Sequence, residues 1–346
     1  MENLIIKDLD NDTLVDFMDC FEKNGNKKKI ENLRWQFFNN TEKKSVVDIA
    51  KDKTTGKTAA IYALACVKFK INNDLVIGSQ SLDTITDVDY RGTGLFINLA
   101  NDVYEKAKAS VTLVYGFPNG NSVKGFKKRL KWQVLDPLPF LIKPLRSKYF
   151  TRKIKYLKFL PDVNLSPFKS ALNKDYKIKE SNDFPEKVND LWAEFSKKFK
   201  VSVHRDTAYL NWRFLQKPNE NYKIAHCYNL DTYVGYIIYT VKEKHGGKIG
   251  YIMDMVYDLT DQNVPTVLLR HATNKIKEEK ADCILSWCLE HSPNYPVYKK
   301  ERFFDFPEKL RPIELHFGAR SFKPEYEEVI ANRDNWFISY ADSDTV

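Results

Sequence analysis

An internal repeat constrains the fold of this chain more than any other feature of its 346 residues. Three segments of the first half recur in the second half, in the same order and at nearly equal spacing. Such a repeat predicts two homologous domains, each with its own core. The matched segments are LRWQFFN at 33–39 with LNWRFLQ at 210–216, LDTITD at 82–87 with MDMVYD at 253–258, and FKKRLKW at 126–132 with YKKERFF at 298–304.

Both halves also predict the same order of secondary structure. Apolar spacing indicates two helices, a meander of three strands, a further helix, a strand and a last helix. A meander is antiparallel, whereas a strand that follows a helical crossover runs parallel to its neighbour. The expected class is therefore α+β, with two tandem domains that each hold a mixed, mainly antiparallel sheet flanked by helices. The expected helices are 12–23, 30–39, 94–109, 121–131, 185–199, 206–216, 263–279 and 294–302, and the expected strands are 45–51, 58–70, 75–86, 111–117, 221–229, 232–243, 248–258 and 282–289.

The composition is that of a globular protein, with 43% hydrophobic residues and no low-complexity tract. The first residues lack the pattern of a secretory signal, and IYALACV at 61–67 is too short to span a membrane. The cysteines are odd in number and have no Cys-x-x-Cys spacing. They predict reduced thiols in a cytoplasmic protein, without a disulfide framework or a metal site.

The net charge of +9 raises the question of a nucleic-acid partner. Basic residues are spread along the whole chain, and the densest stretch, at 143–158, follows a proline-rich run. A nucleic-acid module more often gathers such residues on one helix or among the aromatic residues of a sheet. The charge therefore favours an enzyme that handles polyanionic small molecules over a nucleic-acid binder.

The segment DYRGTGLF at 89–96 places two glycines where a helix is expected to begin. A glycine inside a helix costs about 1 kcal/mol relative to alanine, so the pair needs a reason. One reason is a plain turn between a strand and a helix. The other is a loop whose backbone N–H groups point at a bound phosphate, and we favour this second interpretation.

The element order, with YRGTGLF at the start of the central helix, resembles the GNAT superfamily of acyl-CoA-dependent N-acyltransferases. Its signature is Arg or Gln, two residues, Gly, one residue, and Gly or Ala. Arg91 and Gly94 match this signature, whereas Phe96 departs from it at the last position. A subgroup of tandem GNAT proteins linked to bacterial surface-polysaccharide pathways is more similar still. The motifs that carry this similarity are RGTGLF at 91–96, GFPNGNSVKGFKKRLKW at 116–132, YLNWRF at 209–214 and WFISYADSD at 336–344.

The resemblance implies that the glycine loop binds the pyrophosphate of acyl-CoA, with Gly92 and Gly94 allowing close approach. The second half has DLTDQNVPTVLL at 258–269 in this place, without glycine and with two aspartates that would repel phosphate. We therefore expect an acyl-CoA-binding domain at 1–160 and a domain at 161–346 that binds the acceptor or is structural. No permanently bound cofactor is implied, since acyl-CoA is a cosubstrate.

The expected cofactor-binding residues surround this loop and the end of the next strand. Main-chain N–H groups of Thr93, Leu95 and Phe96 would bind phosphate at the positive end of the helix. Two further members, Asn119 and Ser122, could instead be helix caps, and Phe126 could belong to the core. The full set is Thr84, Arg91, Gly92, Thr93, Gly94, Leu95, Phe96, Asn119, Ser122 and Phe126.

Acyl transfer to an amine needs a deprotonated amine, positioned substrates and a donor for the oxyanion. The resemblance implies a backbone N–H within 82–84 for the oxyanion and Asp83 as the general base. Asp254 aligns with Asp83 in the half without the glycine loop, so a shared structural task is the alternative. His204 and His291 are the other candidate bases. A path through water would need no single base, and Lys127 stands where many family members have a tyrosine.

Four residues are candidates for acceptor binding. Arg205 and Arg213 suit contacts with phosphate, although a solvated helix face or an ion pair would also explain them. Asp342 and Asp344 could bind hydroxyl groups or an amine of the acceptor, and a disordered acidic end is the alternative.

The resemblance implies a cytoplasmic N-acyltransferase that acylates the amine of a dTDP- or UDP-linked amino sugar by direct attack in a ternary complex. An acyltransferase acting on an aminoacyl-tRNA, peptide or protein amine is the alternative enzyme. A catalytically inactive CoA- or nucleotide-binding module is the alternative outside enzymes. Neither a nucleic acid nor a membrane span is expected, and the acyl group, the sugar and the oligomeric state stay open.

Overall fold

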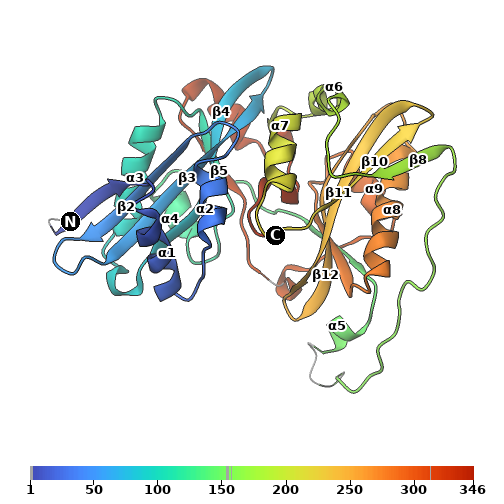
Figure 1. Cartoon of the computed structure of the whole chain (residues 1–346), viewed down its shortest axis with the longest axis horizontal. Coiled ribbons are helices and arrows are strands. Elements are labelled where there is room, and N and C mark those ends of the chain that lie inside the picture. The colour runs from blue at the N-terminus through green and yellow to red at the C-terminus, as the bar shows by residue number, and fades with distance from the viewer. Residues whose placement is uncertain (1–2, 153–155, 157, 312) are drawn as a thin grey trace.

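The computed structural model describes residues 3–152, 156, 158–311 and 313–346, and it shows two β-sheets side by side with helices on their faces (Figure 1). This confirms the α+β class with two mixed sheets that the repeat predicts. The first sheet contains β1 (Leu4–Asp8), β2 (Ser45–Asp52), β3 (Thr58–Ile71), β4 (Asp74–Thr86), β5 (Leu113–Gly116), β15 (Gly318–Ser321) and β6 (Gln133–Val134), with β9 (Val201–Val203) beside β3. The second contains β14 (Phe304–Asp305), β7 (Phe140–Pro144), β13 (Cys283–Trp287), β12 (Gly247–Tyr257), β11 (Thr232–Lys244), β10 (Lys223–Asn229) and β8 (Tyr176–Glu180).

The helices occur in the same order in the two halves. In the first half they are α1 (Leu14–Lys23), α2 (Ile30–Phe37), α3 (Leu95–Ala107), α4 (Val123–Lys128) and α5 (Lys148–Thr151). In the second half they are α6 (Lys187–Phe195), α7 (Thr207–Leu210), which continues into a π-helical turn at 211–215, α8 (Val264–Glu278), α9 (Asn294–Lys300) and α10 (Glu327–Ala331). No helix in the described ranges is long and apolar enough to cross a membrane.

The long strand β3 shows why the first sheet is covered on both faces. Its sequence TAAIYALACVKFKI is almost continuously apolar, which is typical of a strand buried on two sides. Successive side chains point in opposite directions. Tyr62 and Leu64 pack with α3, whereas Ile61 and Ala63 pack with α1 and α2. The sheet therefore lies between α3 on one face and the first two helices on the other.

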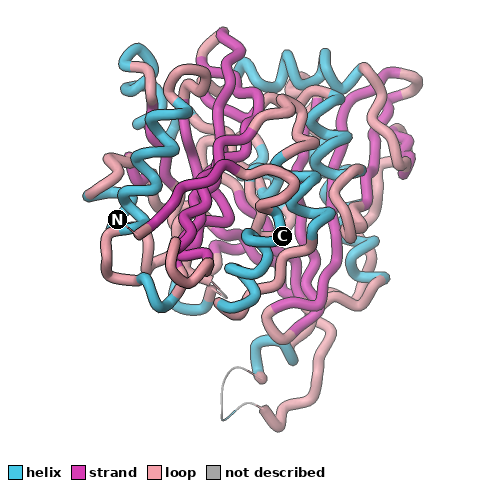
Figure 2. The backbone as a smooth tube through the Cα atoms, turned by 60° about the vertical axis from the view of Figure 1, so that its left-hand side comes forward, coloured by secondary structure: helices cyan, strands magenta, loops and turns pink. Residues whose placement is uncertain are grey.

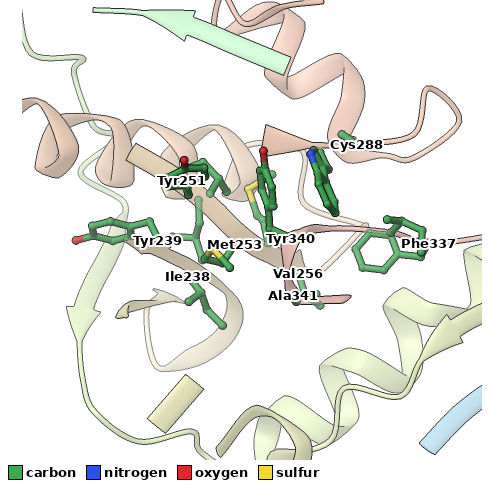
Figure 3. Close-up of a cluster of buried hydrophobic side chains, with 14 of the residues drawn as sticks. Ile238, Tyr239, Tyr251, Met253, Val256, Cys288, Phe337, Tyr340 and Ala341 are labelled. Carbon is green, nitrogen blue, oxygen red and sulfur yellow. The ribbon is translucent and has the colours of Figure 1, made fainter. Parts of the chain in front are cut away.

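Large side chains fill the core of the second half beside β12. Figure 3 shows Tyr251 and Met253 of this strand next to Tyr340, which comes from the C-terminal segment. Tyr340 stacks on Trp287 with 4.2 Å between ring centroids and meets Tyr251 edge-on at 5.5 Å. The segment after residue 336 is thus part of the core. Its last residues lie between the two halves, where the C mark stands in both views (Figures 1 and 2).

Each half of the chain gives strands to the sheet of the other half, and β9 and β15 of the second half both join the first sheet. β7 comes from the first half but pairs antiparallel with β13, and β15 comes from the second half but pairs antiparallel with β5. The short strands β14 and β6 add to β7 and β15, so the exchange is reciprocal. A boundary at residue 160 therefore does not separate the two sheets. The assignment of acyl-CoA to 1–160 and of the acceptor to 161–346 stays a prediction.

Two tryptophans join the halves in a symmetric contact. Trp35 of α2 stacks on Trp212 after α7, with 4.7 Å between ring centroids and 14° between ring planes. Each indole N–H donates to the backbone carbonyl of the other tryptophan, at 2.8 Å from Trp35 and 3.0 Å from Trp212. Two equivalent residues that exchange the same hydrogen bond are typical of a two-fold symmetric contact. The internal repeat is therefore also a structural symmetry.

Every helix and strand expected from the sequence has a counterpart, with ends that differ by a few residues. The crossovers through α3 and α8 make β4 parallel to β5 and β12 parallel to β13, as expected. The sequence pattern missed β1, β6, β7, β8, β9, β14 and β15. These strands are short. Several of them, such as β7 and β15, pair with a strand from a distant part of the chain.

Candidate active site

The candidate site is built around a bulge in β4. The register of β4 against β3 shifts between Leu82 and Ile85, and Asp83 has a left-handed φ of 49°. These are the features of a β-bulge, in which an extra residue is left out of the ladder. On the other edge of β4, its parallel pairing with β5 ends at Ser81 and Gly116. The bulge therefore lies outside both strand pairings.

A cleft of about 470 Å³ opens where β4 and β5 diverge, and we call it the cofactor cleft. Four of the predicted cofactor-binding residues line it, namely Thr84, Asn119, Ser122 and Phe126. Asn119 also accepts hydrogen bonds from the backbone N–H of Ser122 and of residue 121, at 3.1 Å each, so it caps the following turn. Asn119 thus lines the cleft and also caps the turn that follows it.

Two glycines in the left-handed region shape the loop before α3. Gly92 and Gly94 have φ values of 80° and 78°, and a Cβ added to either would meet nothing within 4 Å. Gly94 directly precedes Leu95, the first residue of α3. Within the described ranges, the backbone N–H groups of residues 92–96 have no acceptor. These donors stand at the positive end of a helix, where an anion binds well.

Two other members of the predicted set have side chains that are already engaged. Arg91 donates from Nε to the carbonyl of Thr86 at 3.2 Å, which leaves its other nitrogens toward solvent. Phe96 turns its ring inward against Tyr62 and Phe126, at 5.8 and 5.4 Å between centroids. Its side chain can therefore fill the core while its N–H faces the loop.

The corresponding loop of the second half is arranged differently. Asp258 accepts hydrogen bonds from the N–H and hydroxyl of Thr260, at 2.9 and 2.7 Å, and Asp261 accepts from the N–H of Asn263 at 3.0 Å. Pro265 in the first turn of α8 has no N–H to offer. Carboxylates of the chain thus accept hydrogen bonds from N–H groups of the turn before α8.

A second cavity, of about 220 Å³, lies between the two halves on the other side of β4, and we call it the junction cavity. The stacked Trp35 and Trp212 form part of its wall. The two cavities meet at the bulge, because five residues line both of them: Lys28, Leu82, Asp83, Asp344 and Thr345.

Asp83 is held from two sides where the cavities meet. Its side chain is 6% exposed and forms an ion pair with Lys28. Gln36 of α2 donates from Nε2 to Asp83 Oδ2 at 2.9 Å. The carboxylate is therefore positioned by its neighbours and still reaches both cavities. Whether it acts as a base stays a prediction.

Asp344 comes to the same place from the C-terminal segment. It is exposed to the cavities, yet desolvation by the surrounding protein and the carboxylate of Asp83 together raise its pKa above the ordinary value. Arg213 orders this segment, since Nε donates to the carbonyl of Ala341 at 3.0 Å and a terminal nitrogen donates to that of Ser343 at 2.6 Å. Arg213 and Asp344, two of the predicted acceptor-binding residues, thus line the junction cavity.

The geometry speaks against an acceptor contact by Arg205 and Asp342. Both are almost fully buried and line neither cavity. Arg205 donates to Asp254 at 2.9 Å and to Asp342 at 2.7 Å, and to the carbonyl of Val203 at 3.0 Å. Burial disfavours the charged guanidinium, but the two carboxylates outweigh this and raise its pKa. Arg205 and Arg213 therefore do not share a surface: Arg213 lines the junction cavity, and Arg205 does not.

The two histidines proposed as bases also lie elsewhere. His204 accepts a hydrogen bond from the indole N–H of Trp192 at 3.2 Å, and burial lowers its pKa. His291 bonds to the carbonyl of Trp336 at 2.8 Å. Neither lines the cofactor cleft or the junction cavity. Their positions fit packing roles.

Several residues of the junction cavity were not expected from the sequence. Lys217 is buried beneath it, and desolvation, with the charge of Arg213 added, lowers its pKa. Lys28 had a signal in the sequence, because it stands as far before Trp35 as Arg205 stands before Trp212. The lining residues missed in this way include Lys28, Gln36, Lys217, Glu220, Lys242 and Lys244.

The chain matches no protein-family model and no curated protein. Its fold is nevertheless similar to that of solved structures. Saccharomyces cerevisiae N-myristoyltransferase with bound myristoyl-CoA has a TM-score of 0.62 and 11% identity, over 92% of this chain and 83% of that one. A protein of unknown function from Enterococcus faecalis, described as a probable N-acyltransferase, has a TM-score of 0.57 and 12% identity, over 92% of this chain and 72% of that one. This likeness confirms the tandem GNAT-like fold.

Proposed function

We propose that this protein is an acyl-CoA-dependent N-acyltransferase. One observation carries the proposal: a cleft lined by Phe126 meets a second cavity at the β4 bulge, and Phe126 packs on Phe96 of the glycine loop, whose N–H groups at 92–96 have no acceptor in the described ranges. Such an arrangement lets two substrates enter from different sides and meet at one point. The similar solved structures include an N-myristoyltransferase with bound myristoyl-CoA, which supports acyl-CoA as the donor.

The reaction is direct attack in a ternary complex. The acceptor amine in the junction cavity forms a bond to the thioester carbon, the carbon–sulfur bond breaks, and CoA leaves as a thiolate. A base near Asp83 takes the amine proton, and backbone N–H groups of the bulge stabilise the oxyanion. A covalent route through cysteine has no support, because no cysteine lines either cavity and burial raises the pKa of the Cys66 thiol to about 12.

For the acceptor we propose the amine of a nucleotide-linked amino sugar. Five cationic side chains against three carboxylates line the junction cavity, which suits an acceptor with negative charge such as a sugar diphosphate nucleotide. The aromatic rings of Trp35 and Trp212 in the wall beside these charges suit contact with a sugar or a base. The motifs shared with the surface-polysaccharide subgroup support the same choice.

A peptide or protein amine is the second candidate acceptor. The observation in its favour is the likeness to N-myristoyltransferase, which extends over 92% of this chain. The two candidates are separated by offering the full-length protein acetyl-CoA with either a panel of UDP- and dTDP-linked amino sugars or a panel of peptides with free N-termini. Release of free CoA with one panel alone identifies the acceptor class.

The donor site is tested by Gly94→Glu, with Gly246→Glu as the matched control. Both glycines have positive φ and open space around them, so both variants carry similar backbone strain and should fold. We expect CoA to raise the Tm of the wild type and of Gly246→Glu, but not that of Gly94→Glu, whose side chain would occupy the phosphate position. Unchanged CoA stabilisation of Gly94→Glu would refute the donor site.

A further inference from the structure

One polar side chain in the wall of the junction cavity has a buried atom without a hydrogen-bond partner. Gln80 of β4 lines this cavity, and within the described ranges its side-chain nitrogen Nε2 is buried and unpaired. No other residue of those ranges with such an atom lines the junction cavity or the cofactor cleft. Buried polar groups in proteins are nearly always hydrogen-bonded, so an unpaired amide in a cavity wall indicates a missing partner.

The neighbours of Gln80 in the sheet do not supply this partner. Gln80 stands opposite Ala65 of β3 and Tyr115 of β5, and both also line the cavity. Leu82 points to the same face, because side chains alternate along a strand. Ala65 and Leu82 have no polar side-chain atom, and the Tyr115 hydroxyl donates to the carbonyl of Asp342 at 3.0 Å. Gln80 thus stands in a mainly apolar part of the wall.

An unpaired amide destabilises the free protein, and a ligand can remove this cost. A buried N–H that has lost its water and gained no other partner is unfavourable. Proteins keep such groups at functional sites, where they pay in stability for a contact with the substrate. A ligand oxygen that replaces an ordered water at the amide reproduces the hydrogen bond of that water. Gln80 therefore suits a contact with a ligand.

The position of Gln80 indicates which of the two substrates it would contact. It lies on the strand that carries the bulge, three residues before Asp83. Asp83 lines both cavities, whereas Gln80 lines the junction cavity and not the cofactor cleft. In the proposed reaction, a ligand in the junction cavity is the acceptor and not acyl-CoA.

We propose that Gln80 hydrogen-bonds a hydroxyl group of the acceptor sugar and thereby selects among acceptors. A hydroxyl accepts from the amide N–H or donates to the amide oxygen, so it fits either orientation of the amide. The cationic side chains of the cavity are the better partners for a phosphate. An acceptor without this hydroxyl leaves the amide unpaired and is used less well. The inference rests on the proposed function and adds a specificity-determining residue to it.

The test compares sugars that differ by one hydroxyl, with the full-length protein and acetyl-CoA. The parent is the UDP- or dTDP-linked amino sugar with the highest kcat/KM for release of CoA, and in each analogue one sugar hydroxyl is replaced by hydrogen. We expect the wild type to lose about five- to tenfold in kcat/KM with one analogue, as for one net hydrogen bond. Gln80→Met, which keeps the length of the side chain, should lose a similar factor with the parent and no longer distinguish that analogue from it.

Thermal unfolding separates this role from a structural one. Gln80→Met replaces a buried unpaired polar atom by an apolar group, so its Tm should equal or exceed that of the wild type. Its KM for acetyl-CoA should stay unchanged. Gln133→Met is the matched control, because it makes the same change at an exposed residue of β6 that lines neither cavity. That variant should discriminate among the analogues as the wild type does.

Three results would overturn the inference and leave an N-acyltransferase intact. The first is equal kcat/KM of the wild type for the parent and all its analogues, or unchanged discrimination by Gln80→Met. The second is a lower Tm of Gln80→Met, which would show that the amide is bonded within the fold. The third is release of CoA with the peptide panel alone. No release of CoA with either panel would overturn the proposed function as well.

Discussion

At the scale of single residues, the two halves keep the same ion pair and use it differently. In the second half, Arg205 and Asp254 are buried together with Asp342. In the first half, Lys28 and Asp83 pair at the equivalent place, but both also line the two cavities. A shared origin explains the pairing, and only the open surroundings of the first copy give its carboxylate access to a substrate.

Asp83→Asn separates a catalytic from a structural role. As the general base, Asp83 should contribute at least about 100-fold to kcat. We therefore expect kcat for release of CoA to fall by that factor, with an unchanged Kd for CoA. His204→Ala and His291→Ala serve as controls and should keep the kcat of the wild type. An Asp83→Asn enzyme with normal kcat but lower Tm would assign the pair a structural role in both halves.

Arg205→Ala should destabilise the fold strongly. The change leaves the carboxylates of Asp254 and Asp342 buried without their cation, which costs about 3–5 kcal/mol. Urea denaturation measures the free energy of unfolding. Lys197→Ala is the control, since its pair with Glu194 is exposed, and its stability should stay close to that of the wild type. Equal stability of the two variants would contradict the buried cluster.

At the scale of elements, the halves meet through α2 and the turn after α7. The tryptophans of these elements stack and exchange hydrogen bonds, so each is at once donor, acceptor and packing surface for the other. The same contact forms part of the wall of the junction cavity. The interface between the copies and the candidate acceptor site are therefore built from the same side chains.

This contact predicts a strong coupling between the two tryptophans. Trp35→Ala and Trp212→Ala should each lower the free energy of unfolding by about 3–5 kcal/mol. The double variant should lose clearly less than the sum, because the second change removes a contact that is already gone. Trp35→Ala combined with Trp132→Ala, which belongs to a different core cluster, should be additive. Additivity of the Trp35 and Trp212 changes would show that the contact contributes little.

At the scale of the whole molecule, the exchanged strands tie the two sheets into one unit. The first sheet is completed by β15 from the end of the chain, and the second by β7 from before its middle. Neither half can therefore pair all the strands of its own sheet by itself. An unpaired strand edge with apolar residues on it is a site of aggregation.

Separate expression of residues 1–160 and 161–346 tests this arrangement. We expect each fragment alone to be insoluble or unfolded, and co-expression to restore a folded complex, because only then are all the exchanged strands present. The intact chain should unfold in a single transition that circular dichroism and tryptophan fluorescence report at the same urea concentration. A fragment that unfolds cooperatively on its own, with a Tm near that of the intact chain, would contradict the prediction.

Local patterns in the sequence determined the repeat, the order of the main elements and the glycine loop. Each of these depends on residues that are neighbours in the chain: apolar spacing for α3 and β3, and the two glycines before Leu95 for the loop. Periodicity reports which face of an element is buried, and the conformational freedom of glycine reports where the backbone bends. Such signals can be read without knowing which other element of the fold a helix or strand packs against.

Only the tertiary structure decided what these elements meet. The strand exchange depends on which sheet edges are open in the assembled core, and the short segments β7 and β15 carry no sign of it. The same holds for Asp83 and Asp344, which share a site although they lie far apart in the chain, and for Arg205, which is buried rather than available to a substrate. Contacts between distant segments arise from the fit of whole surfaces, and that fit cannot be read from any local stretch of residues.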